Sequence, residues 1–267
     1  PTEILISDDC SPDNTFEVAR QVVAEYNGPH RVQLWRNERN LGTGNLASCV
    51  ARATGRYIAQ FHGDDISHPN RATRLHEAFT ATGASLISTN SRLIDETGKL
   101  YGALLDDEQS RFLEIPELTK AWSRLQSGST QAFDREIFER FLPWAPDTYW
   151  MANDHILPFR ASLLNGAYFL NETLLDRRQH DGNFGKLARP QHDDQVQTRE
   201  FTHANFLNLR AFMLRDLRHF VESNEENDRT RHAYESLLAA IESRLDDWCS
   251  SRSTLLNRGR RPTWLTP

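Results

Sequence analysis

The chain has 267 residues, enough to bury a sizeable core and to form one large domain or one domain with an appendage. Its formal net charge of −6 argues against a nucleic-acid-binding protein, which would carry a basic excess. Its three cysteines lie far apart without metal-ligand spacing, which excludes a disulfide framework and a structural zinc site.

The expected location is the reducing cytosol, with the inner face of the membrane as an alternative. No apolar run approaches the roughly 18 residues that a membrane-spanning helix needs, and no secretory signal opens the sequence. We therefore expect a soluble protein.

In the first hundred residues, short apolar runs alternate with stretches of helical periodicity. This alternation predicts an α/β fold, a mostly parallel sheet with flanking helices. Ligands bind at the carboxyl ends of the strands in such sheets, so acidic residues that follow two of the strands should face one crevice. The expected elements are strand 4–7, helix 15–26, strand 32–35, helix 44–54, strand 57–61, helix 71–82 and strand 84–91.

One of these helices, 15–26, is expected to carry an apolar face. That face would consist of Phe16, Val18, Ala19, Val22 and Val23.

From residue 101 to 188 the pattern is mixed and predicts an α+β half that completes the crevice. We expect domain 1–188, with its nucleotide-binding half at about 1–100, to be followed by a helical extension, 189–267. The expected elements of the second half are helix 113–125, extended segment 130–133, helices 135–141 and 155–164, and strand 167–170.

The extension contains two amphipathic helices separated by a polar turn near Glu222 to Asp228. A helical hairpin packed on the domain, or on a second copy in a homo-oligomer, is the expected arrangement. A partner-protein contact or a peripheral membrane association through these helices is the alternative. The apolar positions are Phe201, Phe206, Leu209, Met213, Leu217 and Phe220 in the first helix and Tyr234, Leu237, Leu238, Ile241, Leu245 and Trp248 in the second.

Two pairs of adjacent carboxylates follow predicted strands. Asp64 and Asp65 end the run 57–61, and Asp8 and Asp9 end the run 4–7. Adjacent ionised carboxylates repel one another unless a metal, an Arg or a shared proton compensates them, so each pair is a candidate site. A turn followed by a capped helix is an equally simple explanation, because Asp is common in both.

At these positions the chain resembles the inverting glycosyltransferases of family 2, which have the GT-A fold. Three landmarks carry the resemblance in the family's order: a D-D-x-S-x-D-x-T pattern, an N-x-G stretch followed by A-x-G-x-Y-I, and a D-x-D-D metal motif followed by Pro. They correspond to Asp8, Asp9, Ser11, Asp13 and Thr15, then to Asn40-Leu41-Gly42 and Ala53 to Ile58, then to His62-Gly63-Asp64-Asp65 and Pro69.

Two further segments resemble the family. One, 125–133, is similar to its segment near the donor sugar and the acceptor, where small residues let the backbone approach a ligand. The other, 177–183, is similar to its late Y-R-x-H-x-x-N stretch near the diphosphate. A solvated charged loop is the alternative for this late segment. The resemblance covers about residues 3 to 185.

The resemblance implies a nucleotide-diphosphate sugar donor and a glycan, lipid-linked or protein acceptor. The implied cofactor is Mg²⁺ or Mn²⁺, since such ions prefer oxygen ligands and bridge substrate phosphates. The implied metal ligands are Asp64, Asp65 and His180. The implied nucleotide-sugar contacts are Asp8, Asp9, Asn40, Gly42, Asp64 and Arg178.

The implied catalytic base is Asp154, in Asn153-Asp154-His155 at the start of helix 155–164, where family members carry an acidic pair. Helix capping is the alternative explanation of Asn153 and Asp154. A carboxylate near a helix N-terminus also tends to stay ionised, as a base must.

The chain departs from the family at two places. The family's opening strand is absent from this chain, and His62 replaces the first acid of the metal motif. A packed or solvated His62 is the expected arrangement, with a hydrogen bond to the nucleotide as the alternative.

Two other functions compete with the glycosyltransferase. One is a non-catalytic relative that binds or scaffolds. The other is a nucleotidyltransferase, which should carry a Gly-rich pyrophosphate loop that this sequence lacks.

Overall fold

We describe the protein from a computed structural model, which covers residues 2–105, 109–119, 128–141, 143, 153–181, 183, 195–223 and 227–257. The chain divides into two compact units. One comprises Pro1–Glu114 and Trp122–His180, and the other comprises Ile115–Ala121 and Asp181–Pro267. The candidate site residues lie in the first unit.

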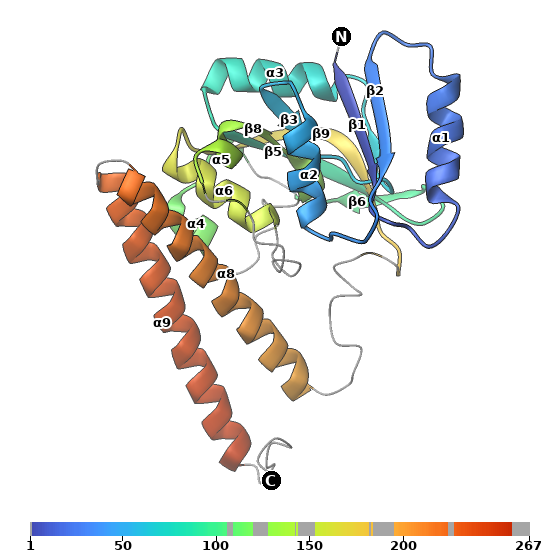
Figure 1. Cartoon of the computed structure of the whole chain (residues 1–267). Coiled ribbons are helices and arrows are strands. Elements are labelled where there is room, and N and C mark those ends of the chain that lie inside the picture. The colour runs from blue at the N-terminus through green and yellow to red at the C-terminus, as the bar shows by residue number, and fades with distance from the viewer. Residues whose placement is uncertain are drawn as a thin grey trace. The chain divides into compact units, whose positions relative to one another are not determined.

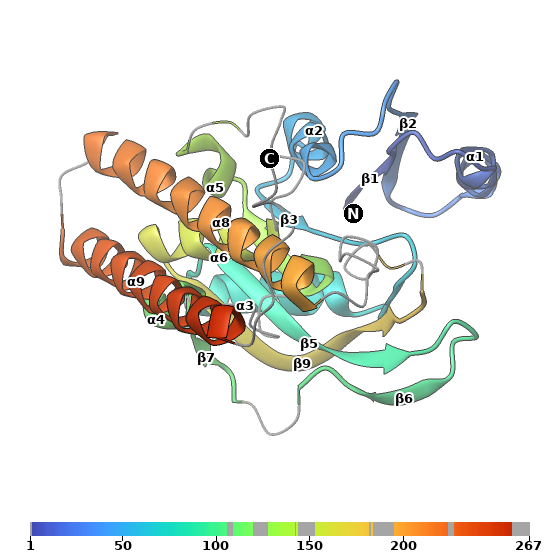
Figure 2. The same ribbon diagram turned by 90° about the horizontal axis from the view of Figure 1, so that it is seen from below.

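The first unit begins with two parallel strands, β1 (Glu3–Asp8) and β2 (Arg31–Arg36), which form a sheet of their own. Helix α1 (Thr15–Glu25) connects them, and α2 (Gly44–Arg52) follows β2. Figure 2 shows α1, β1 and β2 beside the larger sheet.

The larger sheet has seven strands, five of them in the order β3-β8-β5-β9-β4. The pair β5–β9 is parallel, whereas β3–β8, β5–β8 and β4–β9 are antiparallel. Two short strands complete it, β6 against β5 and β7 against β9, both antiparallel. The bounds are β3 Tyr57–Ala59, β4 Ile66–Ser67, β5 Leu86–Ile94, β6 Leu100–Ala103, β7 Arg111–Phe112, β8 Gln131–Asp134 and β9 Ala167–Arg178.

Helices flank this sheet on both faces (Figure 1). Helix α3 (Arg71–Thr82) covers one face, where Tyr57 stacks on Phe79 with ring centroids 4.2 Å apart. Helices α5 (Glu136–Glu139) and α6 (Asn153–Leu163) cover the other. Burial of these apolar faces is the main stabilising contribution. The core under α3 comprises Leu75, Ala78, Phe79, Ala84, Ile87, Ala132 and Leu174.

The α/β class with flanking helices is confirmed, and the sheet is mixed rather than uniformly parallel. Strand β9 is longer than the expected 167–170, since it continues along β5 as far as Arg178. Helix α1 forms as expected, and its apolar face is covered only in part, with Phe16, Ala19 and Val23 half-buried. Val18 and Val22 are 56% and 64% exposed, because β1 and β2 give α1 only a narrow surface.

The second unit contains α4 (Ile115–Thr119), α8 (Gln195–Ser223) and α9 (Asp228–Asn257). Helices α8 and α9 run side by side as the expected hairpin (Figure 1). Buried Arg210 donates a hydrogen bond to the Thr119 carbonyl and lies 4.0 Å from the centroid of the Phe206 ring. Of the expected apolar face, Phe206, Leu209, Met213, Leu217, Phe220 and Leu237 are buried, whereas Tyr234 and Leu238 are exposed.

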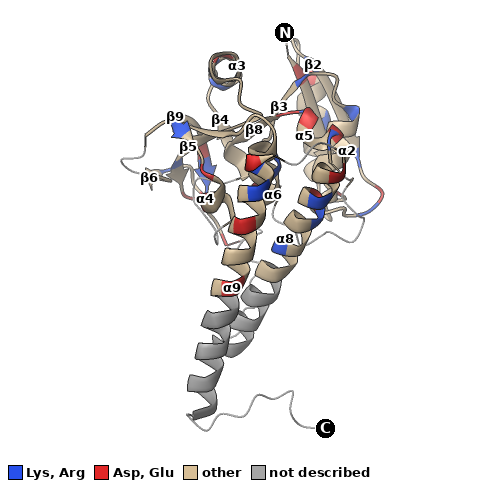
Figure 3. Ribbon diagram, turned by 90° about the vertical axis from the view of Figure 1, so that its left-hand side faces the viewer, with Lys and Arg blue, Asp and Glu red and all other residues tan. Residues whose placement is uncertain are grey.

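Charged residues of both signs are interspersed along the described elements (Figure 3). In the part of the chain that the structure describes, no helix combines the length and the apolar character needed to cross a membrane. The predicted boundary at 189–195 falls almost entirely outside the described residues, as do 120–125 of the predicted helix 113–125.

Candidate active site

The segment after β3 forms a turn that holds the second acidic pair. Hydrogen bonds from the Gln60 backbone N–H to the Gln131 carbonyl (3.0 Å) and from the Asp65 N–H to the His62 carbonyl (3.3 Å) fix its two ends. Asp65 is buried. Its Oδ1 accepts a hydrogen bond from the Arg178 N–H at 2.9 Å, whereas its Oδ2 has no partner among the described residues.

The end of β9 is tied to this turn. The Arg178 guanidinium donates hydrogen bonds to the carbonyls of Asp64 (2.9 Å) and Glu96 (2.9 Å), so much of its hydrogen-bonding capacity is used to hold the turn. His180 follows, with its Nε2 3.1 Å from Asp64 Oδ2. The structure thus brings Asp64 and Asp65 together with Arg178 and His180, which lie more than 110 residues later in the sequence.

His62 joins the acidic pair. One ring nitrogen of His62 and one carboxylate oxygen each of Asp64 and Asp65 all lie within 4.8 Å of one another. Two carboxylates and an imidazole form a donor set that fits a divalent cation, and the partnerless buried Oδ2 of Asp65 is a group that a cation would satisfy. We expected a packed or solvated His62, and its proximity to both carboxylates is the feature that sequence reasoning missed.

A buried arginine lies beneath this turn. The guanidinium of Arg71 donates hydrogen bonds to the Gln60 and Ser129 carbonyls, both at 2.8 Å. Burial lowers the pKa of Arg71 to about 10, while the charge of Asp65 acts in the opposite direction. Arg71 is thus a fixed positive charge that attracts Asp65 through space and leaves its Oδ2 without a donor.

Asp154 approaches the same turn. It lies in the first turn of α6, half-buried, and its carboxylate makes no hydrogen bond or ion pair to the residues that the structure describes. A methyl group placed on Gly128, in the 3₁₀ turn Gly128–Thr130, would lie 3.5 Å from Gln60 Nε2, 3.6 Å from Asp154 Cβ and 3.8 Å from His62 Nε2. The predicted base and the metal motif therefore approach one another at Gly128.

The backbone of Asp154 is held by an unusual partner. Pro158 lies inside α6 and has no N–H for the carbonyl four residues earlier, which is that of Asp154. Gln131, buried on β8, donates its Nε2–H to this carbonyl at 2.9 Å. Gln131 and Pro158 together fix the start of α6. The sequence signal was a proline one turn after Asp154.

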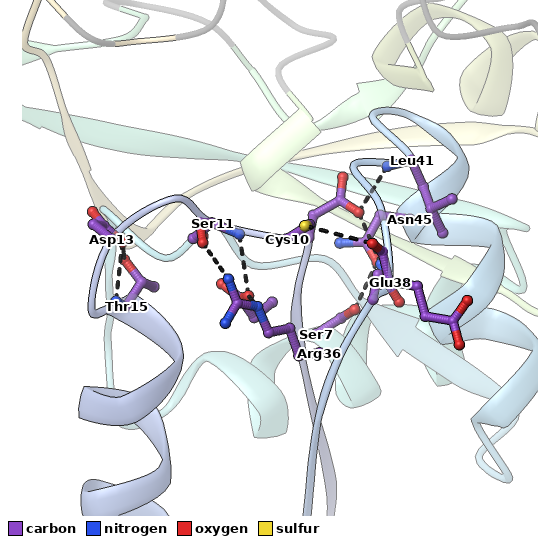
Figure 4. A network of polar contacts seen from close by, with 12 residues as sticks. Ser7, Cys10, Ser11, Asp13, Thr15, Arg36, Glu38, Leu41 and Asn45 are labelled. Carbon is purple, nitrogen blue, oxygen red and sulfur yellow. Dashed lines mark hydrogen bonds and ion pairs between the residues drawn. The ribbon is translucent and has the colours of Figure 1, made fainter.

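The first acidic pair lies in a separate network after β1 (Figure 4). Asp9 is held on both oxygens: Oδ1 accepts hydrogen bonds from Asn37 Nδ2 (2.8 Å) and the Leu41 N–H (2.9 Å), and Oδ2 accepts one from the Gly42 N–H (2.8 Å). Gly42 has a φ of 54°, a left-handed conformation that favours glycine, and its N–H also donates to Asn40 Oδ1 at 2.9 Å.

Asp8 is buried beside this network. Its Oδ2 lies 3.2 Å from Arg36 Nε and accepts the Ser11 N–H at 3.2 Å, whereas its Oδ1 has no partner among the described residues. Asp13 accepts hydrogen bonds from the N–H and hydroxyl of Thr15 at the start of α1 (Figure 4). The turn explanation of 11–15 thus agrees with the structure.

The two acidic pairs are connected through the start of α6. Asn153 donates its Nδ2–H to the carbonyl of Thr43, next to Gly42, at 3.5 Å. Asn153 therefore links the Asn40–Gly42 turn to Asp154, and its Oδ1, the atom that would cap the helix, has no hydrogen-bond partner among the described residues. The predicted residues form two groups, one around Asp9 and one around Asp65, and Asp154 lies at the link.

The model of glycosyl transferase family 2 matches residues 1–142, just over half of the 267 residues. EpsE of Bacillus subtilis (strain 168), assigned as a glycosyltransferase, is 40% identical over 70 residues, which cover 26% of this chain and 24% of EpsE. The succinoglycan biosynthesis protein ExoO of Rhizobium meliloti (strain 1021) is 30% identical over 141 residues, which cover 52% and 39%. The chain thus spans well under half the length of these two relatives.

Among solved structures, the crystal structure of residues 1–349 of S. aureus TarS in complex with UDP-GlcNAc has a TM-score of 0.55 to this chain. The match covers 92% of this chain and 74% of that one, at 14% sequence identity. This likeness shows a shared fold.

Proposed function

The chain belongs to glycosyl transferase family 2, and from this premise we propose that it is an inverting glycosyltransferase that uses a nucleotide-diphosphate sugar. The observation that carries the proposal is the approach of Asp154 and His62 to the same point above Gly128, with Asp64 and Asp65 next in the chain. A base and a cation-binding group that approach one another in this way fit the displacement of a diphosphate from a sugar. TarS, which shares the fold, binds UDP-GlcNAc, and this supports a donor of that class.

The divalent cation, Mg²⁺ or Mn²⁺, is assigned to Asp64, Asp65 and His180. The buried oxygen of Asp65 that lacks a partner among the described residues and the 3.1 Å contact between His180 Nε2 and Asp64 Oδ2 support this assignment. When bound, such a cation supplies positive charge that stabilises a departing diphosphate. Asp8, Asp9, Asn40, Gly42 and Arg178 remain the proposed contacts to the nucleotide sugar.

Asp154 acts as the general base. Its carboxylate accepts the proton of the acceptor hydroxyl while the hydroxyl oxygen forms a bond to the anomeric carbon. The bond between that carbon and the diphosphate oxygen breaks in the same displacement, so the configuration inverts and no covalent enzyme intermediate is needed.

The acceptor is proposed to be a glycan hydroxyl. The similarity to ExoO, a protein of succinoglycan biosynthesis, favours a growing polysaccharide over a protein acceptor. A lipid-linked sugar presents the same hydroxyl chemistry and remains within this proposal.

The proposal is tested with Asp154→Asn. A panel of nucleotide sugars is first screened for divalent-cation-dependent thermal stabilisation of the wild-type protein, because a ligand that binds the folded state raises its stability. Release of the nucleoside diphosphate is then measured with oligosaccharide acceptors. We expect Asp154→Asn to lower kcat by about 10² to 10⁴-fold, the usual contribution of a general base, with donor affinity nearly unchanged.

Glu139→Gln, at an exposed position on α5, is the matched control, since it removes the same charge away from the site. Wild-type turnover by Asp154→Asn would exclude Asp154 as the base. Donor binding by the wild-type protein without transfer to any acceptor would favour the non-catalytic relative.

A further inference from the structure

His62 occupies the place where the resemblance leads one to expect a carboxylate, and it lies beside the two acids that remain. Its side chain is exposed, and one of its ring nitrogens lies within 4.8 Å of an oxygen of Asp64 and of an oxygen of Asp65. An imidazole nitrogen with a lone pair is a metal ligand, so the replacement exchanges an oxygen donor for a nitrogen donor at the same point.

The geometry around Asp65 indicates a missing positive partner independently of His62. Asp65 is 8% exposed, and its Oδ2 is buried without a hydrogen-bond partner among the described residues. A buried carboxylate oxygen is costly unless it is hydrogen-bonded or coordinates a metal. Arg71 Nη2 donates to the carbonyls of Gln60 and Ser129, and its Nε has no partner among the described residues, so no hydrogen bond joins it to this oxygen.

Gln60 is placed to orient the His62 ring. Gln60 Nε2 lies 3.1 Å from His62 Nε2, and Gln60 Oε1 is buried without a partner among the described residues. Rotating the Gln60 side-chain amide by 180° exchanges the positions of Nε2 and Oε1. The hydrogen bonds that each orientation can make decide between the two. With Oε1 toward the ring, Gln60 accepts the Nε2–H of His62 and leaves Nδ1 with a lone pair. Metal-binding histidines usually donate their second N–H to such an acceptor.

We propose that His62 is a metal ligand, held in its ligating orientation by Gln60, and that this makes the site prefer a transition-series dication such as Mn²⁺ over Mg²⁺. The inference rests on the proposed metal-assisted transfer and deepens it by naming the class of cation. Mg²⁺ favours an all-oxygen set, whereas transition dications bind nitrogen donors more tightly.

The test uses the full chain and the metal alone. Mn²⁺ binding is followed by the loss of the electron paramagnetic resonance signal of free Mn²⁺, and Mg²⁺ is added as the competitor. We expect the wild-type protein to bind Mn²⁺ at least tenfold more tightly than Mg²⁺. His62→Asp restores an oxygen donor, so it should lower this ratio to about threefold or less.

A direct readout is the modulation of the bound Mn²⁺ electron spin echo by ¹⁴N, which reports a nitrogen in the coordination sphere. Because His180 is also assigned to the cation, the readout is taken in His180→Gln, where we expect ¹⁴N modulation that is lost when His62→Gln or His62→Asp is added. Because His62 is exposed, these variants should fold, and circular dichroism verifies this.

Two further variants identify the histidine that supplies the nitrogen bound to Mn²⁺. His76→Gln removes an exposed histidine of α3, which is not part of the three-residue group, and should retain the wild-type modulation. His180→Gln removes the other histidine beside Asp64 and is the background in which His62 is replaced. Modulation that persists when His62 is replaced in this background, or an unchanged Mn²⁺ to Mg²⁺ ratio in His62→Asp, would overturn the role of His62 alone. The absence of Mn²⁺ binding by the wild-type protein would overturn the metal-assisted transfer as well, so the failures of the two proposals are distinguishable.

Discussion

The two acidic pairs look alike in the sequence but differ in what surrounds them. Asp9, of the first pair, accepts hydrogen bonds from Asn37, Leu41 and Gly42. Asp65, of the second, accepts one from the Arg178 N–H and keeps a buried oxygen without a partner in the described part of the chain. Asp8, of the first pair, also keeps a buried oxygen without a partner among the described residues, but the Arg36 guanidinium compensates its charge at the other oxygen. Asp65 has no such ion pair among the described residues, so it is the carboxylate that fits a cation.

The largest expected effect concerns the second pair. Asp65→Asn should weaken Mn²⁺ binding by about 100-fold or more, because it removes a charged donor from a group of three. Isothermal titration calorimetry measures this, with Glu77→Gln on the exposed face of α3 as the control for loss of one negative charge. Equal Mn²⁺ affinity in Asp65→Asn and in Glu77→Gln would show that Asp65 does not bind the cation, which contradicts the proposed difference between Asp65 and Asp9.

The next effect concerns folding and the first pair. Asp9→Asn should lower the free energy of unfolding by about 2 kcal/mol, because its new NH₂ group faces the Gly42 N–H and the charge that strengthens the other hydrogen bonds is lost. Asp65→Asn, the same chemical change, should alter it by less than about 1 kcal/mol, since asparagine can still accept the Arg178 N–H.

Urea unfolding at equilibrium in the absence of divalent cations compares the two variants. Similar losses of stability in both would show that the hydrogen bonds of Asp9 do not distinguish it from Asp65. A loss of stability in Asp65→Asn alone would mean that Asp65, and not Asp9, is the carboxylate whose hydrogen bonds stabilise the fold.

Much of the fold could be predicted because periodicity is a local property. The helix predicted at 71–82 matches α3, and the segments predicted at 4–7, 32–35 and 130–133 lie within one or two residues of β1, β2 and β8. The features that the sequence did not predict depend on contacts between residues far apart in the sequence. Strand β9 continues to Arg178 because β5 pairs with it there, and α1 stays exposed because β1 and β2 form a sheet of their own.

The candidate site could be predicted to a similar extent. The order of motifs predicted that Asp64, Asp65, Arg178 and His180 act together, and the structure brings these four into contact. The roles of Gln131 and Gly128 depend on which side chains face them across the sheet, and that is set by the register of β8 with its neighbours. A sequence without relatives aligned to it holds no local signal for such contacts.

Asp154 can be compared with Asp65, because the carboxylate of each accepts few hydrogen bonds. The backbone carbonyl of Asp154, in contrast, is held by a hydrogen bond from Gln131. Pro158→Ala supplies an N–H that can bond the Asp154 carbonyl within α6 and compete with Gln131 for it. We expect a small effect, a decrease in kcat of about threefold through displacement of the base, with unchanged donor KM. The melting temperature should be equal or higher, because proline in a helix interior is unfavourable.

Gln131→Met is the matched variant, since it removes the amide and keeps a similar volume at a buried position. It should lower kcat in the same direction, and the double variant should lose less than the sum of the two effects, because both act on one carbonyl. Strict additivity, or a Pro158→Ala enzyme with wild-type kcat, would mean that the position of Asp154 does not depend on how its carbonyl is bonded. The anchoring of the base would then lie in the Asn153–Thr43 contact, which connects α6 to the loop around Asp9.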